Sequence, residues 1–165
     1  MRVFRLGLAR YLTTRKEAFS GKGGVMASGR WHTEGHLIIY TAQSLSLAAL
    51  EILVHLKTTE KVEPFVSYAA EVPDDLILEP RSYPRGWKNR IHSSRVFGDA
   101  WLAAKTTPAM RVPTILAPGE WNLLINPLHP DFSLNWIQRG PERFAFDARL
   151  LTGPQPKRGA GRRRS

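Results

Sequence analysis

Three side chains that could act on one ligand fall within 22 residues of one another. Arg30 lies in a polar stretch, Tyr40 ends an apolar one, and Glu51 is the single acid of a run rich in Leu, Ile, Val and Ala. An arginine can hold an anion, a tyrosine can stack on a flat ring, and a carboxylate can stabilise a developing positive charge. A nicotinamide dinucleotide is a ligand with all three features.

The position of Glu51 on its predicted helix has two interpretations. At about 100° per residue, Ser44, Glu51 and His55 fall within about 40° of one another. They could form a narrow solvent-facing stripe on a half-buried helix. Alternatively the stripe faces a cleft, where a carboxylate among apolar residues has to be paired or used.

The other polar positions also have structural interpretations. Arg30 could be a surface arginine stacked on Trp31, and Tyr40 could be a half-buried strand tyrosine. The segment 122–130 places asparagines and prolines around a buried strand, and its simplest role is to cap and turn the chain.

The sequence gives little support for a metal site or for a nucleophilic catalytic residue. His32 and His36 have the spacing of a helical zinc pair, but Gly35 and the strand expected next argue against a helix there. The chain has no cysteine, which removes thiolate metal sites, thiol nucleophiles and disulfides. The glycines at 21, 23 and 24 match neither a Walker loop nor a dinucleotide fingerprint, and no Gly-x-Ser-x-Gly elbow occurs. We expect no metal site.

The elements that must position these residues follow from periodicity and turn signals. A long loop is expected at 13–30, and the run after Ser44, with neither Gly nor Pro, predicts a helix over 45–56 capped by that serine. A second helix is expected over 94–105. Predicted strands cover 2–8, 37–41, 62–70, 76–79, 110–116, 122–125 and 144–151, so the pattern favours one α+β domain.

Composition bounds the class of protein. With 165 residues and 42% hydrophobic content, the chain can bury a real core. No apolar run approaches the ~20 residues of a membrane span, and the start is typical of a strand rather than of a signal peptide, so we expect a cytoplasmic protein.

The formal net charge is +10, and the stretch 157–165 holds five bases and no acid. We predict a domain over 1–153 and a basic, flexible tail over 154–165. A non-enzymatic basic module that binds nucleic acid is an alternative, although no known reading module appears.

Short blocks along nearly the whole chain resemble the RES domain family, which is named for an arginine, a glutamate and a serine. The order and spacing of the blocks carry the resemblance, since each block alone is weak. They are Phe4-Arg5-Leu6, Ser28-Gly29-Arg30-Trp31-His32, Ile39-Tyr40-Thr41, Ala49-Leu50-Glu51-Ile52-Leu53-Val54-His55, Phe97-Gly98-Asp99-Ala100-Trp101, Val112-Pro113-Thr114, Trp121-Asn122 and Asn126-Pro127-Leu128-His129-Pro130.

The resemblance implies an α+β fold like that of the ADP-ribosyltransferase toxins, with a split mixed or antiparallel sheet and few helices. It implies the toxin of a bacterial type II toxin–antitoxin pair, neutralised by an Xre-type helix-turn-helix antitoxin. Such toxins consume NAD⁺ by hydrolysis or phosphorolysis, or transfer its ADP-ribose to a protein. NAD⁺ is then a substrate, no cofactor is expected, and DNA would be contacted only through the antitoxin.

Carried over position by position, the resemblance implies catalytic roles for Glu51, Arg30 and Thr114. It implies NAD⁺ contacts from Arg5, Arg30, Tyr40 and Thr114. The family's serine position holds Thr114, so this chain departs from the name-giving pattern. Threonine keeps the hydroxyl but adds a methyl group and stiffens the side chain.

Overall fold

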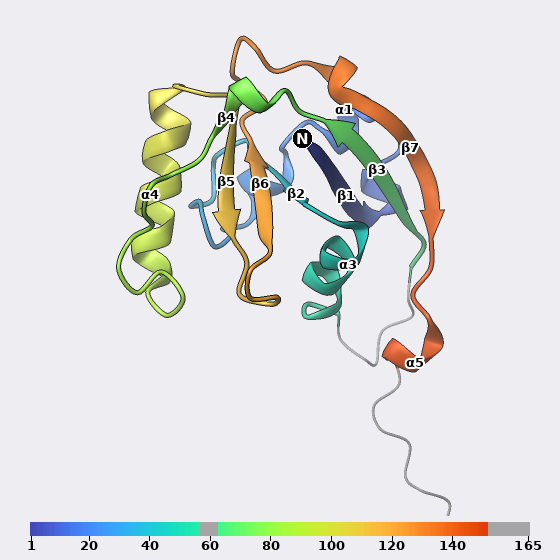
Figure 1. Cartoon of the computed structure of the whole chain (residues 1–165). Helices are drawn as coiled ribbons and strands as arrows, with labels where there is room; N and C mark the ends of the chain where they lie inside the picture. The colour runs from blue at the N-terminus through green and yellow to red at the C-terminus, as the bar shows by residue number, and fades with distance from the viewer. Residues whose placement is uncertain (57–62, 152–165) are drawn as a thin grey trace, which may run out of the picture.

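The computed structural model describes residues 1–56 and 63–151, and its centre is one seven-stranded sheet. The strand order is β4-β5-β6-β2-β1-β3-β7, and each neighbouring pair is antiparallel except β4 with β5. In Figure 1 β5 and β6 stand on the left and β7 curves along the right edge. The strands are β1 Arg2–Leu8, β2 Ile39–Ala42, β3 Phe65–Glu71, β4 Ile77–Leu78, β5 Ala109–Pro113, β6 Trp121–Ile125 and β7 Ile137–Phe144.

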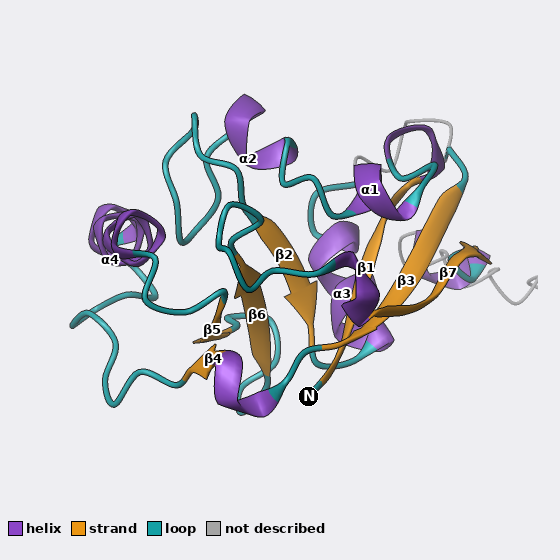
Figure 2. Cartoon of the chain, turned by 90° about the horizontal axis from the view of Figure 1, so that it is seen from above, coloured by secondary structure: helices purple, strands orange, loops and turns teal. Residues whose placement is uncertain are grey.

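Two longer helices, α3 and α4, pack on the same face of this sheet. α3 buries Leu47 and Ala48 against β1 and β2, and α4 buries Trp101 and Leu102 against β5 and β6. Figure 2 shows α4 end on, beside the β4–β5 end of the sheet. The helices in the described part of the chain are α1 Arg15–Ala18, α2 Gly23–Met26, α3 Leu45–Leu53, α4 Ile91–Ala104 and α5 Ala148–Leu151. The expected α+β class with few helices is confirmed.

The opposite face of the sheet carries the largest core cluster. Side chains alternate along a strand, so Val3 joins this cluster while Phe4 and Leu6 face α3. Phe19 packs edge to face on Tyr68 at 6.1 Å between ring centroids, which attaches the segment after α1 to this face. The sheet is therefore covered on both sides.

The sheet is split between β1 and β2. These strands share a single register pair, Phe4 with Ala42, whereas β1 and β3 pair at seven consecutive positions. Residues 39–41 of β2 therefore have no register partner on β1, and other donors must replace the missing ladder bonds. The split lies where the Arg5 guanidinium of β1 reaches the Tyr40 backbone carbonyl of β2.

Local sequence explains the helix that carries Glu51. Ser44 is its N-cap, and the serine hydroxyl accepts a hydrogen bond from the Leu47 backbone N–H at 3.0 Å. The helix ends at Leu53 rather than at the predicted residue 56, and His55 lies beyond it, exposed to solvent. The predicted helix and its cap are confirmed, with a shorter C-terminal end.

Two predicted segments are wrong. The closing strand is β7, Ile137–Phe144, and not 144–151, where α5 forms instead. Pro141 breaks the pattern of a strand in the sequence, yet β7 is an edge strand, where a residue without an N–H donor is tolerated. The expected loop 13–30 contains α1 and α2, two short helices of four residues each.

The predicted basic tail 154–165 and the boundary at residue 153 lie outside the described residues. The start of the predicted strand 62–70 also falls there, and its described part is β3. Within the described ranges, no helix has the length and apolar character needed to cross a membrane.

Candidate functional site

The Glu51 carboxylate is held by two side chains from the β5–β6 hairpin. Thr114 Oγ1 donates to Glu51 Oε1 at 2.9 Å, and Asn122 Nδ2 donates to the same oxygen at 2.7 Å. Thr114 and Asn122 are buried and Glu51 is half-buried. No described residue bonds to Oε2, so the carboxylate is fixed through one oxygen and offers the second. We call these three residues the acid cluster.

Strand register explains why the two donors meet. Asn122 pairs with Val112 across the β5–β6 ladder, and Thr114 lies two residues further along, next to Glu120. Residues two apart on a strand share a face, so both side chains point toward α3. Thr114 Oγ1 also accepts the Leu116 N–H at 3.1 Å, which fixes the direction of its hydroxyl proton.

Tyr40 uses its phenol to hold the loop that carries Arg30. Its oxygen accepts the Trp31 backbone N–H at 3.1 Å and lies 2.9 Å from His32 Nδ1. Burial raises the pKa of Tyr40, the Trp31 bond opposes that rise, and the charges of Asp99 and Glu51 add to it. Tyr40 pairs with Leu124 of β6, two residues from Asn122, so Tyr40 and Asn122 leave the sheet on the same face.

His32 completes the support of this loop. Its Nδ1 accepts the Gly29 backbone N–H at 3.1 Å, and its Nε2 lies 3.1 Å from the Ala27 carbonyl, which makes Nε2 the protonated nitrogen. Burial lowers the pKa of His32 despite the carbonyl contacts, so the ring is neutral at pH 7. The imidazole is thus structural, and no other histidine in the described ranges joins it in a group that could hold a metal ion.

Helix α4 fixes the far side of the same loop. Asp99 accepts both the backbone N–H and the hydroxyl of Thr33, at 3.0 and 2.8 Å. Arg95 Nε donates to the Gly29 carbonyl at 2.9 Å. A Cβ placed on Gly98 would lie 1.8 Å from the Trp31 carbonyl oxygen, so only glycine allows this approach. We call residues 29–33 with these supports the arginine loop.

Arg30 is anchored by backbone oxygens and not by an acid. Its Nη1 donates to the carbonyls of Trp87 and Lys88, each at 3.2 Å. Within residues 1–56 and 63–151 no carboxylate lies within ion-pair distance of its guanidinium. The structure does not bring Arg30 into contact with Glu51, so its charge is available to an anionic ligand.

Arg5 lies at the split between β1 and β2. Its Nη1 donates to the Tyr40 carbonyl at 3.0 Å, which supplies a donor where the β1 ladder is missing. Arg5 alternates with Phe4 and Leu6 and so leaves β1 on the face away from α3. Burial lowers the pKa of Arg5 to about 10, so it stays charged at pH 7. Its Nε is buried and has no partner.

The structure therefore brings the predicted residues together in two groups. Glu51 and Thr114 are in direct contact. Arg5 donates to the backbone carbonyl of Tyr40, and the Tyr40 hydroxyl in turn holds the loop that carries Arg30. Their predicted contacts with NAD⁺, including ring stacking by Tyr40, stay predictions.

The capping role expected of 122–130 holds for Asn126, whose Oδ1 accepts the Leu128 N–H at 3.0 Å. It is wrong for Asn122, whose contact with Glu51 was not predicted. The signal that could have found it is the position of Thr114 and Asn122 on two predicted strands that follow each other closely in the sequence.

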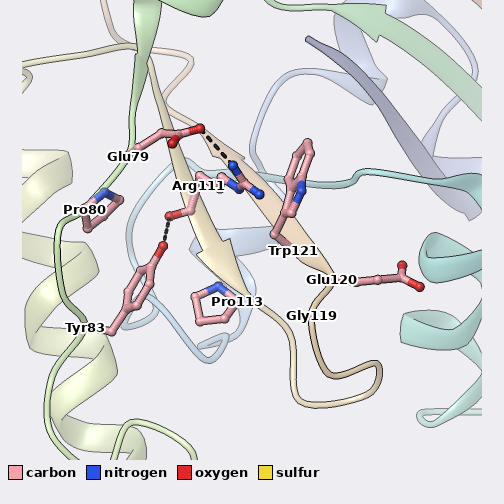
Figure 3. Close-up of a pocket in the computed structure, with 8 residues that line it drawn as sticks. All are labelled: Glu79, Pro80, Tyr83, Arg111, Pro113, Gly119, Glu120 and Trp121. Atoms are coloured by element: carbon pink, nitrogen blue, oxygen red, sulfur yellow. Dashed lines mark hydrogen bonds and ion pairs between the residues drawn. The ribbon is translucent and has the colours of Figure 1, made fainter.

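A separate cavity of about 270 Å³ lies beside the β5–β6 hairpin (Figure 3). Arg111 donates to Glu79 at 2.9 Å and lies 4.7 Å from the Trp121 ring, so the charges inside this cavity are already partly neutralised. Arg111 and Trp121 leave their strands on the face away from Val112 and Asn122. The lining residues are Glu79, Pro80, Tyr83, Arg111, Pro113, Gly119, Glu120 and Trp121.

The fold and the family agree. The fold is a split, mostly antiparallel sheet with one acid from a helix held against a strand hairpin. The RES domain family model matches residues 2–147. The chain belongs to the RES domain family.

Proteins with related sequences extend over almost the same length. The chain is 34% identical to "Toxin Res" of Yersinia enterocolitica, covering 91% of this chain and 99% of that one. It is 36% identical to the "Prs ADP-ribosylating toxin" of Sphingobium sp., covering 84% and 90%. A chain of the M. tuberculosis MbcT–MbcA toxin–antitoxin complex shares the fold, with a TM-score of 0.65, 16% identity and coverage of 91% and 86%.

Proposed function

We propose that this protein is the toxin of a bacterial type II toxin–antitoxin pair and that it consumes NAD⁺ by cleaving the nicotinamide N-glycosidic bond. The observation that carries the proposal is the Glu51 carboxylate, held through Oε1 by two buried donors while Oε2 remains available. Membership of the RES domain family and relatives named as toxins support it.

The proposed reaction breaks the bond between the ribose C1′ and the nicotinamide nitrogen. The bonding electron pair leaves with nicotinamide, which becomes neutral, and the ribose develops oxocarbenium character. A fixed carboxylate beside that ribose stabilises the positive charge and holds a sugar hydroxyl, as acids do in glycoside chemistry. We assign this task to Glu51. The acceptor then bonds to C1′ and releases its own proton.

The remaining predicted residues would bind the rest of the dinucleotide. Arg5 and Arg30 are cations with no acidic partner in the described residues, which suits them to pyrophosphate or ribose oxygens. Tyr40 would stack on nicotinamide. The hydroxyl proton of Thr114 is already directed at Glu51, so its main task is to hold the carboxylate, with any ligand contact made through its oxygen.

Transfer of ADP-ribose to a protein is the second candidate. The 36% identity to a relative named an ADP-ribosylating toxin favours it specifically. The cleavage step and the role of Glu51 are the same in both candidates, and only the nucleophile at C1′ differs.

Product identification separates these candidates. The purified protein is incubated with NAD⁺ alone, with added inorganic phosphate or with added cell protein, and the products are identified by mass spectrometry. ADP-ribose indicates water as the acceptor, phosphorylated ADP-ribose indicates phosphate, and nicotinamide release that requires added cell protein indicates a protein. Absence of nicotinamide release in all three arms contradicts the proposal. Binding of nucleic acid that falls steeply with salt would then favour the basic binding module.

The proposed partner is an Xre-type antitoxin, and the proposed compartment is the bacterial cytoplasm, where NAD⁺ is available. Support comes from the shared fold with a chain of a toxin–antitoxin complex. Co-expression with a neighbouring helix-turn-helix gene should restore growth and yield a stable complex on size exclusion. Failure to rescue growth would separate this chain from an antitoxin of that type.

A further inference from the structure

Two buried side-chain atoms in the described residues lack any hydrogen-bond partner, Arg5 Nε and Asn122 Oδ1. Buried polar groups in native proteins are nearly always paired, and an unpaired one carries a desolvation penalty. Both atoms belong to strands that neighbour β2, since β1 lies on one side of it and β6 on the other. Arg5 leaves its strand on the face away from α3, whereas Asn122 lies on the α3 face beside Glu51, so Asn122 Oδ1 is the unpaired atom that belongs to the acid cluster.

The orientation of the Asn122 amide is fixed by its chemistry. Its Nδ2 donates to Glu51 Oε1 at 2.7 Å. Exchanging the amide oxygen and nitrogen would bring an acceptor against a carboxylate oxygen, where neither atom has a proton to share. The unpaired atom is therefore an acceptor, and the side chain that carries it is only 8% exposed.

An unpaired acceptor beside the carboxylate selects a donor on the substrate. Under the proposed function Glu51 lies against the ribose on the nicotinamide side, and Asn122 shares a hydrogen bond with that carboxylate. The donors on a ribose are its hydroxyl groups, since the ring oxygen and the glycosidic nitrogen carry no proton. A ribose hydroxyl held near Glu51 Oε2 would thus find a second acceptor in Oδ1.

We infer that Asn122 is a substrate-binding residue of this site, with its Nδ2 positioning Glu51 and its Oδ1 accepting a hydrogen bond from a hydroxyl of the nicotinamide-side ribose; this rests on the proposed function. Asn126 on the same hairpin provides the structural counterpart. Both polar ends of its amide are paired within the protein, to Leu102 O and to the Leu128 N–H. Of these two asparagines, Asn122 is the one with an amide end left for substrate.

The test is a thermodynamic cycle that combines removal of a substrate hydroxyl with removal of the Asn122 side chain. NAD⁺ and its analogues lacking the 2′- or the 3′-hydroxyl of the nicotinamide ribose are compared on wild type and Asn122→Ala by kcat/KM. Removal of a ribose hydroxyl also changes the intrinsic lability of the glycosidic bond. This change cancels in the comparison because both enzymes receive the same substrates. For one analogue, we expect the loss in kcat/KM relative to NAD⁺ to be about tenfold larger on wild type than on Asn122→Ala. This difference is the size of one hydrogen bond. Equal ratios for both analogues on both enzymes overturn the inference.

A second variant covers poor folding of the alanine form. Asn122→Asp places a carboxylate beside Glu51, so one of the two carboxyls stays protonated to higher pH. We expect the acid limb of the kcat/KM profile to move up by about one pH unit or more. The matched control Asn126→Asp should leave that limb in place. An unmoved limb in Asn122→Asp contradicts the positioning role.

Failure of the proposed function and failure of the role of Asn122 give different results. If wild type releases no nicotinamide from NAD⁺, the proposed function is wrong and the inference falls with it. If wild type turns NAD⁺ over and the cycle shows no coupling, only the role of Asn122 is wrong.

Discussion

The acid cluster and the arginine loop are built by different means. In the acid cluster, side chains from one helix and one hairpin bond to one another, and the three residues form a closed set around one carboxylate oxygen. In the arginine loop, side chains of Tyr40, His32 and Asp99 bond to the backbone of the loop. The first arrangement sets the charge and direction of an acid, and the second sets the shape of a chain segment.

This difference predicts different responses to mutation. A change in the acid cluster that keeps side-chain volume should alter chemistry and leave stability nearly intact. A change in the supports of the arginine loop should lower stability and NAD⁺ binding together, because buried backbone groups lose their partners.

The largest effect is expected from Glu51→Gln. The glutamine oxygen can still accept from Thr114 and Asn122, so the fold is kept while the charge is lost. We expect NAD⁺ turnover to fall by about 10³-fold, the scale of removing one electrostatic stabiliser of a transition state. Nicotinamide release and thermal unfolding measure the two outcomes. Glu79→Gln, at the separate cavity, is the matched control and should turn over like wild type. Wild-type turnover in Glu51→Gln removes Glu51 from the chemistry.

Gly98→Ala should break the arginine loop through its packing. The new Cβ would overlap the Trp31 carbonyl oxygen, so α4 and the loop must separate. We expect a loss of about 3 kcal/mol, a fall in melting temperature of about 10 °C and weaker NAD⁺ binding by calorimetry. Gly23→Ala is the control, since a Cβ there meets nothing within 4 Å. Equal stability of the two variants would contradict this packing.

Tyr40→Phe isolates one hydrogen-bonded group of the loop. The ring remains for stacking, but the Trp31 N–H and His32 Nδ1 lose their shared partner. We expect about 1–3 kcal/mol of destabilisation in urea titrations. The control Tyr83→Phe removes a hydroxyl bonded to the Arg111 carbonyl and should leave NAD⁺ affinity unchanged. Unchanged stability of Tyr40→Phe would show that the loop does not depend on this hydroxyl.

The smallest effect is the pH dependence of the loop. Because burial lowers the pKa of His32 below 6.5, the unfolded chain takes up a proton first as pH falls. The stabilisation is present above the unfolded-state pKa of about 6.5 and is lost as the pH falls below it. Urea titrations of wild type and His32→Asn at pH values above and below about 6.5 measure it. An identical pH dependence in the variant would assign the effect to other groups.

Much of the fold was visible in the sequence because its signals are local. The Ser44 cap, the apolar run after it and the alternating strands each depend on neighbouring residues, and they appear nearly as predicted. The edge strand β7 was missed because its proline and its charged residues read as a break, and only its place at the end of the sheet order makes them tolerable.

The sequence by itself determined the family and the residue types, since Arg30, Tyr40, Glu51 and Thr114 stand in blocks of recognisable order. Tertiary structure alone decided how they meet. The hydrogen bond between Glu51 and Asn122 joins residues 71 positions apart, and no local pattern encodes strand order or register across such a distance. The pairing of β6 with β2 and β5, and the packing of α3 above them, turned an expected capping asparagine into the partner of the acid.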